Sequence, residues 1–324
     1  MASRQNLPSK DWQPGPSQAV RQRRAQLYKQ IRAFFELRQV LEVDTPIMSV
    51  SASTDPMLDH LSSRNSGRDY YLQTSPEFAM KRLLAAGSGS IYQICRCFRA
   101  GESGRRHNPE FVMLEWYRID FSVAQLIDEV IALLQLWFPQ RVVQFYDYRE
   151  LLLERTGLEY EQASLEDVRK YLASDSGNYS EALLHGNLDD LYDLVLASEI
   201  ESTLGIDVIT VISNYPASQA QLAQLTPDGA SAQRFEIYIN GIEMANGYEE
   251  LRDVVEQAER FAQHNERREE LLKPAIAVDQ RLLSALDHGI PPCSGVALGI
   301  DRLLMLITEK ESLDEVIEFS IERA

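Results

Sequence analysis

Apolar and polar residues alternate along this chain with two different periods. Over 17–38 and 121–138, apolar residues recur every three or four positions, the spacing that gives a helix one buried face. Runs rich in β-branched and aromatic residues predict strands over 90–98, 110–119 and 207–215. The same criteria predict further strands over 40–48, 70–73 and within 234–248, and further helices over 77–86 and 251–272.

The strands 90–98 and 110–119 flank a loop with a mixed set of charged side chains. That set is Arg99, Glu102, Arg105, Arg106 and His107. Several cations and hydrogen-bond donors at one loop are typical of a site for an anionic ligand. The alternative from the residues alone is an amphipathic edge hairpin whose charged loop is simply solvated.

Alternation along the second strand separates two faces. Side chains two residues apart share a face, so Phe111, Glu115 and Tyr117 point the same way. This face carries a carboxylate between two aromatic side chains. The opposite face is predicted to be core and carries Val112, Leu114 and Trp116.

The segment 295–306, GVALGIDRLLML, predicts a short strand that leads into a helix. Gly295 and Gly299 allow the backbone to approach a ligand closely. Asp301 is expected to cap the helix and Arg302 to lie in its first turn. An arginine at a helix N-terminus suits a polyphosphate ligand.

A second group of polar residues lies in the run RFEIYINGIEMANGY. The dipeptide Asn240-Gly241 is a strong signal for a two-residue hairpin turn. That turn pairs Tyr238 with Glu243 and places Glu236 diagonally to Glu243 on the same face. Two carboxylates so close favour a cation between them, and oxygen ligands favour Mg²⁺ completed by phosphates. The alternative is a solvent-facing acidic pair.

These motifs resemble those of class II aminoacyl-tRNA synthetases. Phe98-Arg99 with the following loop resembles the second signature motif of that family, and GIDR at 299–302 resembles the third. The segment 36–46, ending in Thr45-Pro46, resembles the first motif, which forms the dimer interface in the family. The resemblance covers the chain from about residue 17.

Within the class, the similarity is to lysyl-tRNA synthetases. It rests on TSPEFAMKRL at 74–83, RHNPEF at 106–111 and EMANGYEEL at 243–251. The chain most resembles the short paralogues that attach (R)-β-lysine to elongation factor P. The resemblance implies an α+β fold of the class II synthetase type, with a mostly antiparallel sheet flanked by helices.

The resemblance also implies roles for individual residues in forming an acyl-adenylate from ATP and a lysine-like acid. Arg99 would hold the α-phosphate and Arg302 the γ-phosphate, and these two are the expected catalytic residues. The expected ATP-binding set is Arg99, Ala100, Gly101, Glu102, His107, Asn108, Phe111, Glu243, Met244, Gly299 and Arg302. Phe111 would stack on adenine. Glu236 and Glu243 match the metal-binding glutamates of lysyl-tRNA synthetases, which implies Mg²⁺.

The expected set for the acid substrate is Ser75, Pro76, Glu77, Tyr117, Asn246, Tyr248, Glu250 and Ala297. Glu250 would pair with the distal ammonium of lysine or (R)-β-lysine, with Tyr117 and Glu77 fixing the substrate. A carboxylate at the start of a helix can also serve only as a partner of the helix dipole, which is the alternative for Glu77.

Two positions depart from the family pattern. Synthetases have a glutamate two residues after the second-motif arginine, where this chain has Gly101. Glu102, or backbone groups of Ala100 and Gly101, would then contact adenine. Lysyl-tRNA synthetases generally have glycine where this chain has Ala297, whose methyl group would disfavour an α-amino group. The alternative is that Ala297 only packs against the strand beneath it.

Charge and length bear on the choice of acyl acceptor. The 324 residues carry a net charge of −17, which disfavours extensive contact with nucleic acid phosphates. Full lysyl-tRNA synthetases carry an anticodon-binding barrel before the catalytic domain, and no such domain is expected here. Elongation factor P is therefore the expected acceptor and tRNA is not. The competing hypotheses are tRNA aminoacylation and a catalytically inactive regulatory subunit.

The remaining expectations concern organisation and compartment. Residues 1–16 are expected to form an irregular arm and 17–324 a catalytic domain with a helical insertion at about 147–204. Three cysteines without a CxxC motif predict reduced thiols, and no apolar signal or 18-residue apolar run is present. The protein is expected to be a cytoplasmic homodimer that does not contact membranes.

The helix predicted over 17–38 is basic. It carries Arg21, Arg23, Arg24, Lys29 and Arg32. These cations form either a solvated face, which is slightly favoured, or a docking surface for an acidic partner.

Overall fold

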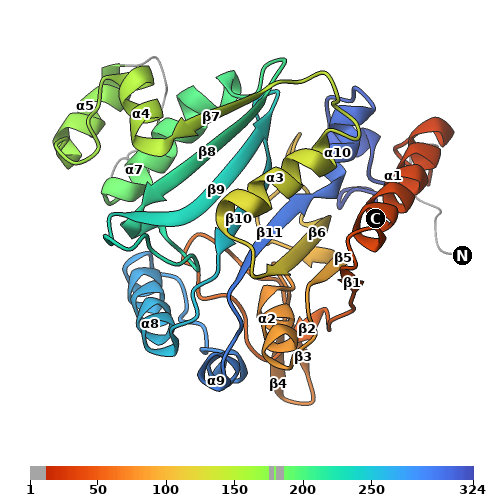
Figure 1. Cartoon of the computed structure of the whole chain (residues 1–324), viewed down its shortest axis with the longest axis horizontal. Coiled ribbons are helices and arrows are strands. Elements are labelled where there is room, and N and C mark those ends of the chain that lie inside the picture. Colours follow the sequence, from red (N-terminus) through yellow and green to blue (C-terminus); the bar gives the residue numbers. More distant parts are fainter. Residues whose placement is uncertain (1–11, 175–178, 180–185) are drawn as a thin grey trace, which may run out of the picture. The chain divides into compact units, whose positions relative to one another are not determined.

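A computed structural model describes residues 12–174, 179 and 186–324 of the chain. Its main element is an eight-stranded sheet in the order β1-β5-β6-β11-β10-β9-β8-β7 (Figure 1). The bounds are β1 Leu41–Glu42, β5 Ile91–Phe98, β6 Glu110–Ile119, β7 Val143–Asp147, β8 Ile209–Pro216, β9 Ser231–Ile239, β10 Ile242–Glu249 and β11 Cys293–Gly299. Strands β8, β9 and β10 pair antiparallel, whereas β1 with β5 and β7 with β8 pair parallel. The expected α+β mixture with a mostly antiparallel sheet is confirmed.

The chain divides into two compact units. Unit 1 comprises Met1–Trp116, Ala258–His288 and Leu298–Ala324, and unit 2 comprises Tyr117–Gln257 and Gly289–Ala297. Strands β6 and β11 each contribute residues to both units. Each unit is described by itself below.

The first described helix of unit 1 is α1, Gln18–Glu36. Ser17 caps this helix by accepting a hydrogen bond from the Val20 backbone nitrogen at 3.4 Å. Leu27, Ile31 and Phe35 are fully buried, as the apolar periodicity predicts. Helix α1 packs against α10, Ile300–Ile307, and α2, Glu77–Ala85, packs against α9, Gln280–His288. A small sheet of β2 Met48–Ser49, β3 Ser62–Asn65 and β4 Arg68–Leu72 belongs to the same unit.

The strand predicted over 40–48 is wrong for most of its length. Only Leu41–Glu42 and Met48 lie in strands, and 43–47 has no regular structure. Pro46 is the physical reason, because it has no backbone N–H to donate and restricts the residue before it.

Unit 2 contains β7 to β10 together with helices that pack on these strands. Helix α3, Val123–Leu134, has a capping box made by Ser122 and Gln125 and packs on β9 and β10. The expected insertion is helical in its described part. It consists of α4 Tyr148–Thr156, α5 Leu165–Ser174, α7 Leu188–Val195, a π-helical turn Leu196–Ile200 and a 3₁₀ turn Glu201–Thr203. Residues 175–178 and 180–185 of the insertion, and 1–11 of the expected arm, lie outside the described residues. Helix α8, Val254–Glu270, crosses from unit 2 into unit 1.

The turn between β9 and β10 forms as predicted. Asn240 and Gly241 have φ of 51° and 66°, the left-handed pair that a type I′ hairpin requires. The strands register Tyr238 opposite Glu243, also as predicted.

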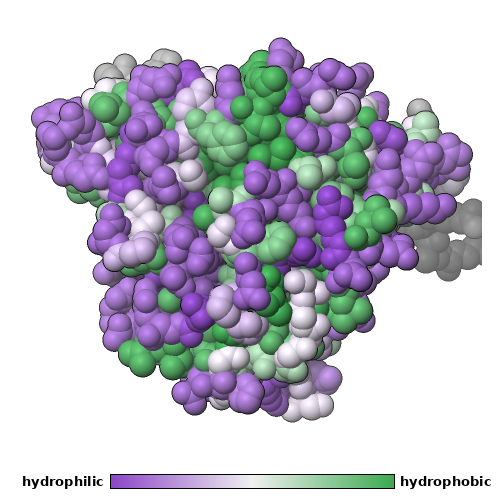
Figure 2. Space-filling model, in the orientation of Figure 1, coloured by the Kyte–Doolittle hydropathy of each residue, from purple (hydrophilic) through white to green (hydrophobic). Residues whose placement is uncertain are grey.

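The face of the molecule in Figure 2 is covered mostly by hydrophilic residues, with apolar residues gathered in smaller patches. Among the described residues, no helix has the length and apolar character needed to cross a membrane.

Candidate active site

The second-motif arginine lies at the end of β5 in unit 1. The Arg99 backbone nitrogen donates to the Pro109 carbonyl at 2.9 Å, which closes the loop between β5 and β6. The Arg99 guanidinium lies 5.2 Å from the centre of the Phe111 ring and 3.6 Å from the Glu102 carboxylate. Strands β5 and β6 are interior in the sheet order, so the alternative of an edge hairpin is wrong.

The third-motif arginine lies beside the loop histidine. Arg302 Nη2 and His107 Nε2 are 2.8 Å apart. A guanidinium can only donate, so His107 Nε2 accepts and its proton lies on Nδ1. Burial and the neighbouring Arg302 lower the pKa of His107, which keeps the ring neutral at neutral pH. The structure thus brings Arg99, His107 and Phe111 of the second-motif hairpin together with Arg302 of the third motif within unit 1.

The start of helix α10 differs from the prediction. Gly299, not Asp301, is the cap residue, and no side chain bonds to the first turn. Asp301 lies two residues after Gly299, in the first turn of the helix, and is buried. Its carboxylate accepts from Arg24 Nη2 at 2.6 Å and from the Val112 backbone nitrogen at 2.7 Å.

The loop beyond Arg99 is tied down by backbone contacts. The Ala100 nitrogen donates to the Asp59 carbonyl at 2.9 Å. Asn108 is buried, donates to the Glu110 carbonyl at 2.6 Å and accepts from the Ile321 nitrogen at 3.0 Å. Gly101 has φ of 78°, a conformation that disfavours the glutamate found in related motifs. Because Glu102 pairs with Arg99, backbone groups are the better candidates for contact with adenine.

Three residues expected to bind the acid precede helix α2. The Ser75 hydroxyl accepts from the Glu77 nitrogen at 3.0 Å and donates to Glu115 at 2.7 Å. The Glu77 carboxylate lies 2.7 Å from the buried Lys81 ammonium. Pro76 is the N-terminal cap residue of the helix. Glu115 was not among the predicted site residues, although its place between two aromatic residues of β6 was a visible signal.

A β-bulge decides which residues of β10 share a face with Glu236 in unit 2. Glu243 lies opposite Tyr238, but the register then shifts and Asn246, not Ala245, lies opposite Glu236. Met244 is the extra residue of the bulge. With strict alternation, Glu243 and Asn246 would point to opposite faces of the sheet. The bulge places both side chains on the same face.

The same face carries Tyr248, which lies opposite Arg234. Its hydroxyl donates to Gln221 Oε1 at 2.6 Å. Asn246 and Tyr248, two of the residues expected to bind the acid, therefore share a face with Glu236 and Glu243.

Glu236 is buried and held by three donors. Arg234 Nη2 and Asn246 Nδ2 donate to Oε1 at 2.6 and 3.0 Å, and the Tyr238 hydroxyl donates to Oε2 at 2.6 Å. The alternative of a solvent-facing acidic pair is wrong for Glu236, which is 6% exposed. Burial and Glu236 raise the pKa of Tyr238, so this hydroxyl remains a donor.

These contacts define how the residues would fit Mg²⁺. A carboxylate has about four lone-pair directions, so Glu236 retains one, on Oε2, for a metal ion. Glu243 is half-buried and its carboxylate can supply another ligand. No group of three or more His, Cys, Asp or Glu able to hold a metal occurs among the described residues. Two carboxylates fit a Mg²⁺ ion that takes its other ligands from phosphates and water.

Tyr117 and Glu250 meet around Gly295 in unit 2. A Cβ placed on Gly295 would lie 2.3 Å from Tyr117 Cε1 and 2.4 Å from Glu250 Oε1. Glycine is therefore required for these side chains to lie against the β11 backbone. Glu250 is 1% exposed. Ala297 is two residues beyond Gly295 in β11, so its methyl group lies on the face that carries Tyr117 and Glu250.

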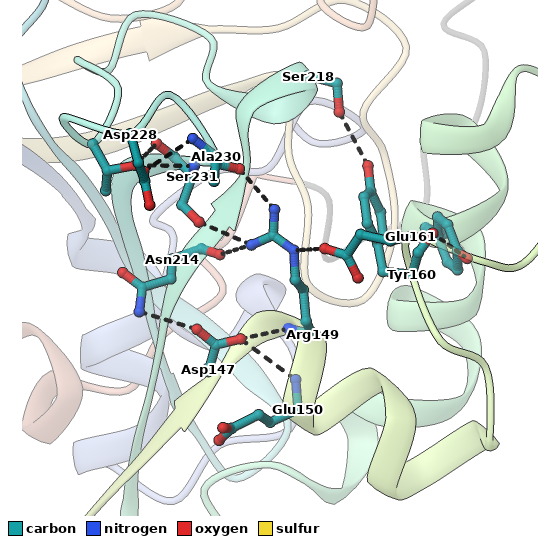
Figure 3. Close-up of polar contacts among 12 residues, drawn as sticks. Asp147, Arg149, Glu150, Tyr160, Glu161, Asn214, Ser218, Asp228, Ala230 and Ser231 are labelled. Carbon is teal, nitrogen blue, oxygen red and sulfur yellow. Dashed lines mark hydrogen bonds and ion pairs between the residues drawn. The ribbon is translucent and has the colours of Figure 1, made fainter.

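Helix α4 of the insertion is anchored to the β8–β9 region by one arginine. Figure 3 shows the Arg149 guanidinium bonding Glu161 Oε1, the Asn214 carbonyl at 3.2 Å and the Ala230 carbonyl at 2.7 Å. The Ser231 hydroxyl also accepts from Arg149 Nη1, at 2.9 Å. These contacts hold the bulge of β8 near Asn214 and the turn that precedes β9.

The insertion also holds the segment that follows β8. The Tyr160 hydroxyl lies 3.1 Å from Ser218 Oγ (Figure 3), and both bond to Asp189. Gln219 Nε2 donates to Asp193 at 3.0 Å. The Gln219 carbonyl accepts from Arg234, the residue that holds Glu236. The insertion is thus connected to the candidate metal ligand Glu236 through Gln219 and Arg234.

Asp193 is an unusual group in this network. Burial raises its pKa to about 7, although the nearby Arg234 opposes the rise. The sequence gives no signal for this, because Arg234 and Glu236, which also act on this carboxylate, lie on a different element.

Comparison with known proteins agrees with this arrangement. The sequence matches the family described as tRNA synthetases class II (D, K and N) over residues 11–323. It is 43% identical over 320 residues to a protein of Pseudoalteromonas translucida (strain TAC 125) and 44% identical over 321 residues to one of Edwardsiella ictaluri (strain 93-146). A protein of Salmonella typhi is 43% identical over 321 residues. Each comparison covers 97% of this chain and 98% of the relative, and each relative is named elongation factor P–(R)-beta-lysine ligase.

The family match covers almost the whole chain and includes all three motifs on which the resemblance rests. This chain therefore belongs to the class II tRNA synthetases of the D, K and N group.

Proposed function

We propose that this protein activates (R)-β-lysine, or lysine, with ATP and transfers the acyl group to a lysine ε-amine of elongation factor P. The observation that carries this proposal is the full-length similarity to relatives that bear this ligase name. The two groups of side chains, one suited to ATP and one to a cationic acid, supply the chemistry.

In the first step, a carboxylate oxygen of the acid attacks the α-phosphate of ATP and pyrophosphate leaves. Arg99 and Arg302 offset the negative charge that accumulates on the phosphates, with Arg302 exchanging His107 for the γ-phosphate. The Phe111 ring stacks on adenine, opposite the side that faces Arg99. Mg²⁺, when bound by Glu236 and Glu243, supplies further positive charge beside the phosphates.

The acid is recognised by its ammonium groups. Glu250 supplies a buried negative charge, and Tyr117 packs beside it. Asn246 Oδ1 is buried and has no hydrogen-bond partner among the described residues, so it can accept from a substrate ammonium. An acid without the distal ammonium would leave Asn246 Oδ1 buried without a donor, which disfavours its binding.

In the second step, the neutral ε-amine of the acceptor lysine attacks the acyl carbonyl. The C–N bond of an amide forms, the bond to the phosphate oxygen breaks and AMP leaves. The amine proton is released with the departing AMP or to water. Positioning of the two substrates supplies most of the acceleration, because neither step requires a covalent enzyme intermediate.

The same proposal includes a cytoplasmic homodimer that uses Mg²⁺ and does not act on tRNA. The dimer interface would involve 36–46, by similarity to the first motif. The net charge of −17 opposes contact with the phosphates of tRNA.

The test is to incubate the protein with ATP, Mg²⁺ and either (R)-β-lysine or lysine, in the presence of elongation factor P or tRNA. We expect the intact mass of elongation factor P to rise by one lysyl group, with (R)-β-lysine the better donor. The Arg302→Ala variant is the negative control. Aminoacylated tRNA with unmodified elongation factor P would favour a tRNA synthetase. Absence of pyrophosphate exchange with either acid would favour an inactive regulatory subunit.

A further inference from the structure

Asp301 joins three separate elements of unit 1. It is 3% exposed and immediately precedes Arg302 in the first turn of α10. One carboxylate oxygen accepts from Arg24 Nη2 of α1 at 2.6 Å, and the other accepts from the Val112 nitrogen of β6 at 2.7 Å. Each oxygen of this carboxylate thus fixes a different element.

Two residues of the candidate ATP site are adjacent in sequence to this contact. Arg302 follows Asp301 directly, and Phe111 precedes Val112 directly. The distance and direction between the γ-phosphate arginine and the adenine-stacking ring therefore depend on one buried side chain.

Arg24 is not part of the solvated basic face that the sequence favours. The Arg24–Asp301 pair is largely withdrawn from water, with side-chain exposures of 15% and 4%. The same Nη2 atom donates to the Val316 carbonyl at 2.9 Å, and Nη1 donates to the Tyr28 hydroxyl at 3.3 Å. Arg24 thereby also attaches the C-terminal segment to α1. By contrast, Arg21 on the same helix pairs with Glu318 at 2.9 Å, and both side chains are partly exposed.

We propose that Arg24 and Asp301 are positioning residues for ATP, which hold Arg302 and Phe111 in the geometry that binds the nucleotide. This inference rests on the proposed function, because it assumes that those residues bind ATP. Neither Arg24 nor Asp301 contacts the nucleotide itself.

The physical reason is the cost of an uncompensated buried charge. Removal of Arg24 leaves the Asp301 carboxylate buried with only one backbone donor, so α10 has to shift to let water reach it. A displacement on the order of 1 Å at a binding group can cost a factor of about a hundred. Because α1 directly precedes the segment that resembles the dimerisation motif, the pair also links that segment to the ATP site.

The experiment measures the dissociation constant of ATP and the KM for lysine in four proteins. These are the wild type, Arg24→Met, Asp301→Asn and the matched control Arg21→Met. Asp301→Asn keeps the shape, but its single amide oxygen can accept from only one of the two donors. We expect the dissociation constant of ATP to rise on the order of ten- to a hundredfold in Arg24→Met and Asp301→Asn. We expect it to change less than about twofold in Arg21→Met.

A purely structural role would lower the melting temperature and weaken both substrates together. The positioning role predicts that the KM for lysine stays within about twofold of wild type while ATP affinity falls. The milder variant Arg24→Lys retains a cation at Asp301 and should recover part of the ATP affinity, which keeps the test decisive if Arg24→Met does not fold. Unchanged ATP affinity in Arg24→Met, or equal loss for both substrates, would overturn the inference. If the wild type itself binds no ATP, the proposed function fails instead.

Discussion

The arginines expected to bind the phosphates of ATP in unit 1 are partly exposed, whereas the carboxylate expected to bind the distal ammonium in unit 2 is buried. The Arg99 side chain is 30% exposed, and Arg302 contacts an exposed histidine. Glu250 is 1% exposed, and the candidate metal ligand Glu236 of the same unit is 6% exposed and held by three donors on strands β9 and β10.

The difference follows from the charges of the two ligands. A polyphosphate brings several negative charges that exposed arginines can meet at low desolvation cost. A carboxylate selects substrates that carry an ammonium group over those that lack it only if the carboxylate is withdrawn from water. An unmatched charge is costly there. We therefore expect changes in unit 1 to affect rate and changes in unit 2 to affect selectivity.

The largest expected effect is the loss of a phosphate-binding arginine. Arg99→Ala or Arg302→Ala should reduce ATP–pyrophosphate exchange on the order of a hundred- to a thousandfold, because each guanidinium offsets charge that develops in the transition state. The matched control is Arg105→Ala in the same loop, whose ion pair with Glu311 is largely exposed. Near-normal exchange in Arg302→Ala would show that the γ-phosphate is held elsewhere.

The next effect tests selectivity in unit 2. Glu250→Gln keeps the shape and removes the charge, so the kcat/KM for lysine should fall about ten- to a hundredfold while ATP affinity is retained. Pyrophosphate exchange at varied lysine, with ATP binding measured separately, checks this. Glu249→Gln, one residue away on the opposite side of the strand, is the control. Equal loss of ATP binding in Glu250→Gln would make that residue structural.

The third effect concerns Asp193, whose side chain is exposed although its carboxylate bonds Gln219 beside Arg234 and Glu236. Its pKa is raised to about 7 in the folded protein, so the unfolded chain loses this proton first. The free energy of unfolding should therefore fall as the pH rises from about 4 to about 7. Asp193→Asn removes this dependence. Denaturant titrations at pH 5 and pH 8 measure it, and identical pH slopes in both proteins would show that Asp193 does not titrate as described.

The smallest effect belongs to Ala297. Its methyl group lies on the face that carries Tyr117 and Glu250, and one methyl group is worth about 1 kcal/mol of discrimination. Ala297→Gly should raise the efficiency of lysine activation relative to (R)-β-lysine severalfold. The ratio of the two kcat/KM values is the measurement. If that ratio is unchanged, the choice between α- and β-amino acids is made elsewhere in the pocket.

The sequence by itself was sufficient for the local features. The Asn240-Gly241 turn fixed the register of β9 and β10, because only left-handed residues fit a two-residue hairpin. Apolar periodicity located α1 and α3, and the residue types around Arg99 and Arg302 indicated an anionic ligand. The strand predicted over 40–48 was wrong because Pro46 interrupts it. The sequence already contained the evidence against this strand, since proline cannot donate a backbone hydrogen bond.

What only the tertiary structure decided depends on contacts between residues far apart in the chain. Arg24 and Asp301 are 277 positions apart, and no local pattern distinguishes an arginine that folds inward from its exposed neighbours on the same helix. Ser75 and Glu115 are separated by 40 positions and meet only when the segment that precedes α2 lies against β6. The bulge at Met244 reverses the alternation of β10 and brings Asn246 to Glu236. Each of these follows from the packing of whole elements, because burial and hydrogen-bond geometry are set by the neighbours that folding supplies and not by the residue type alone.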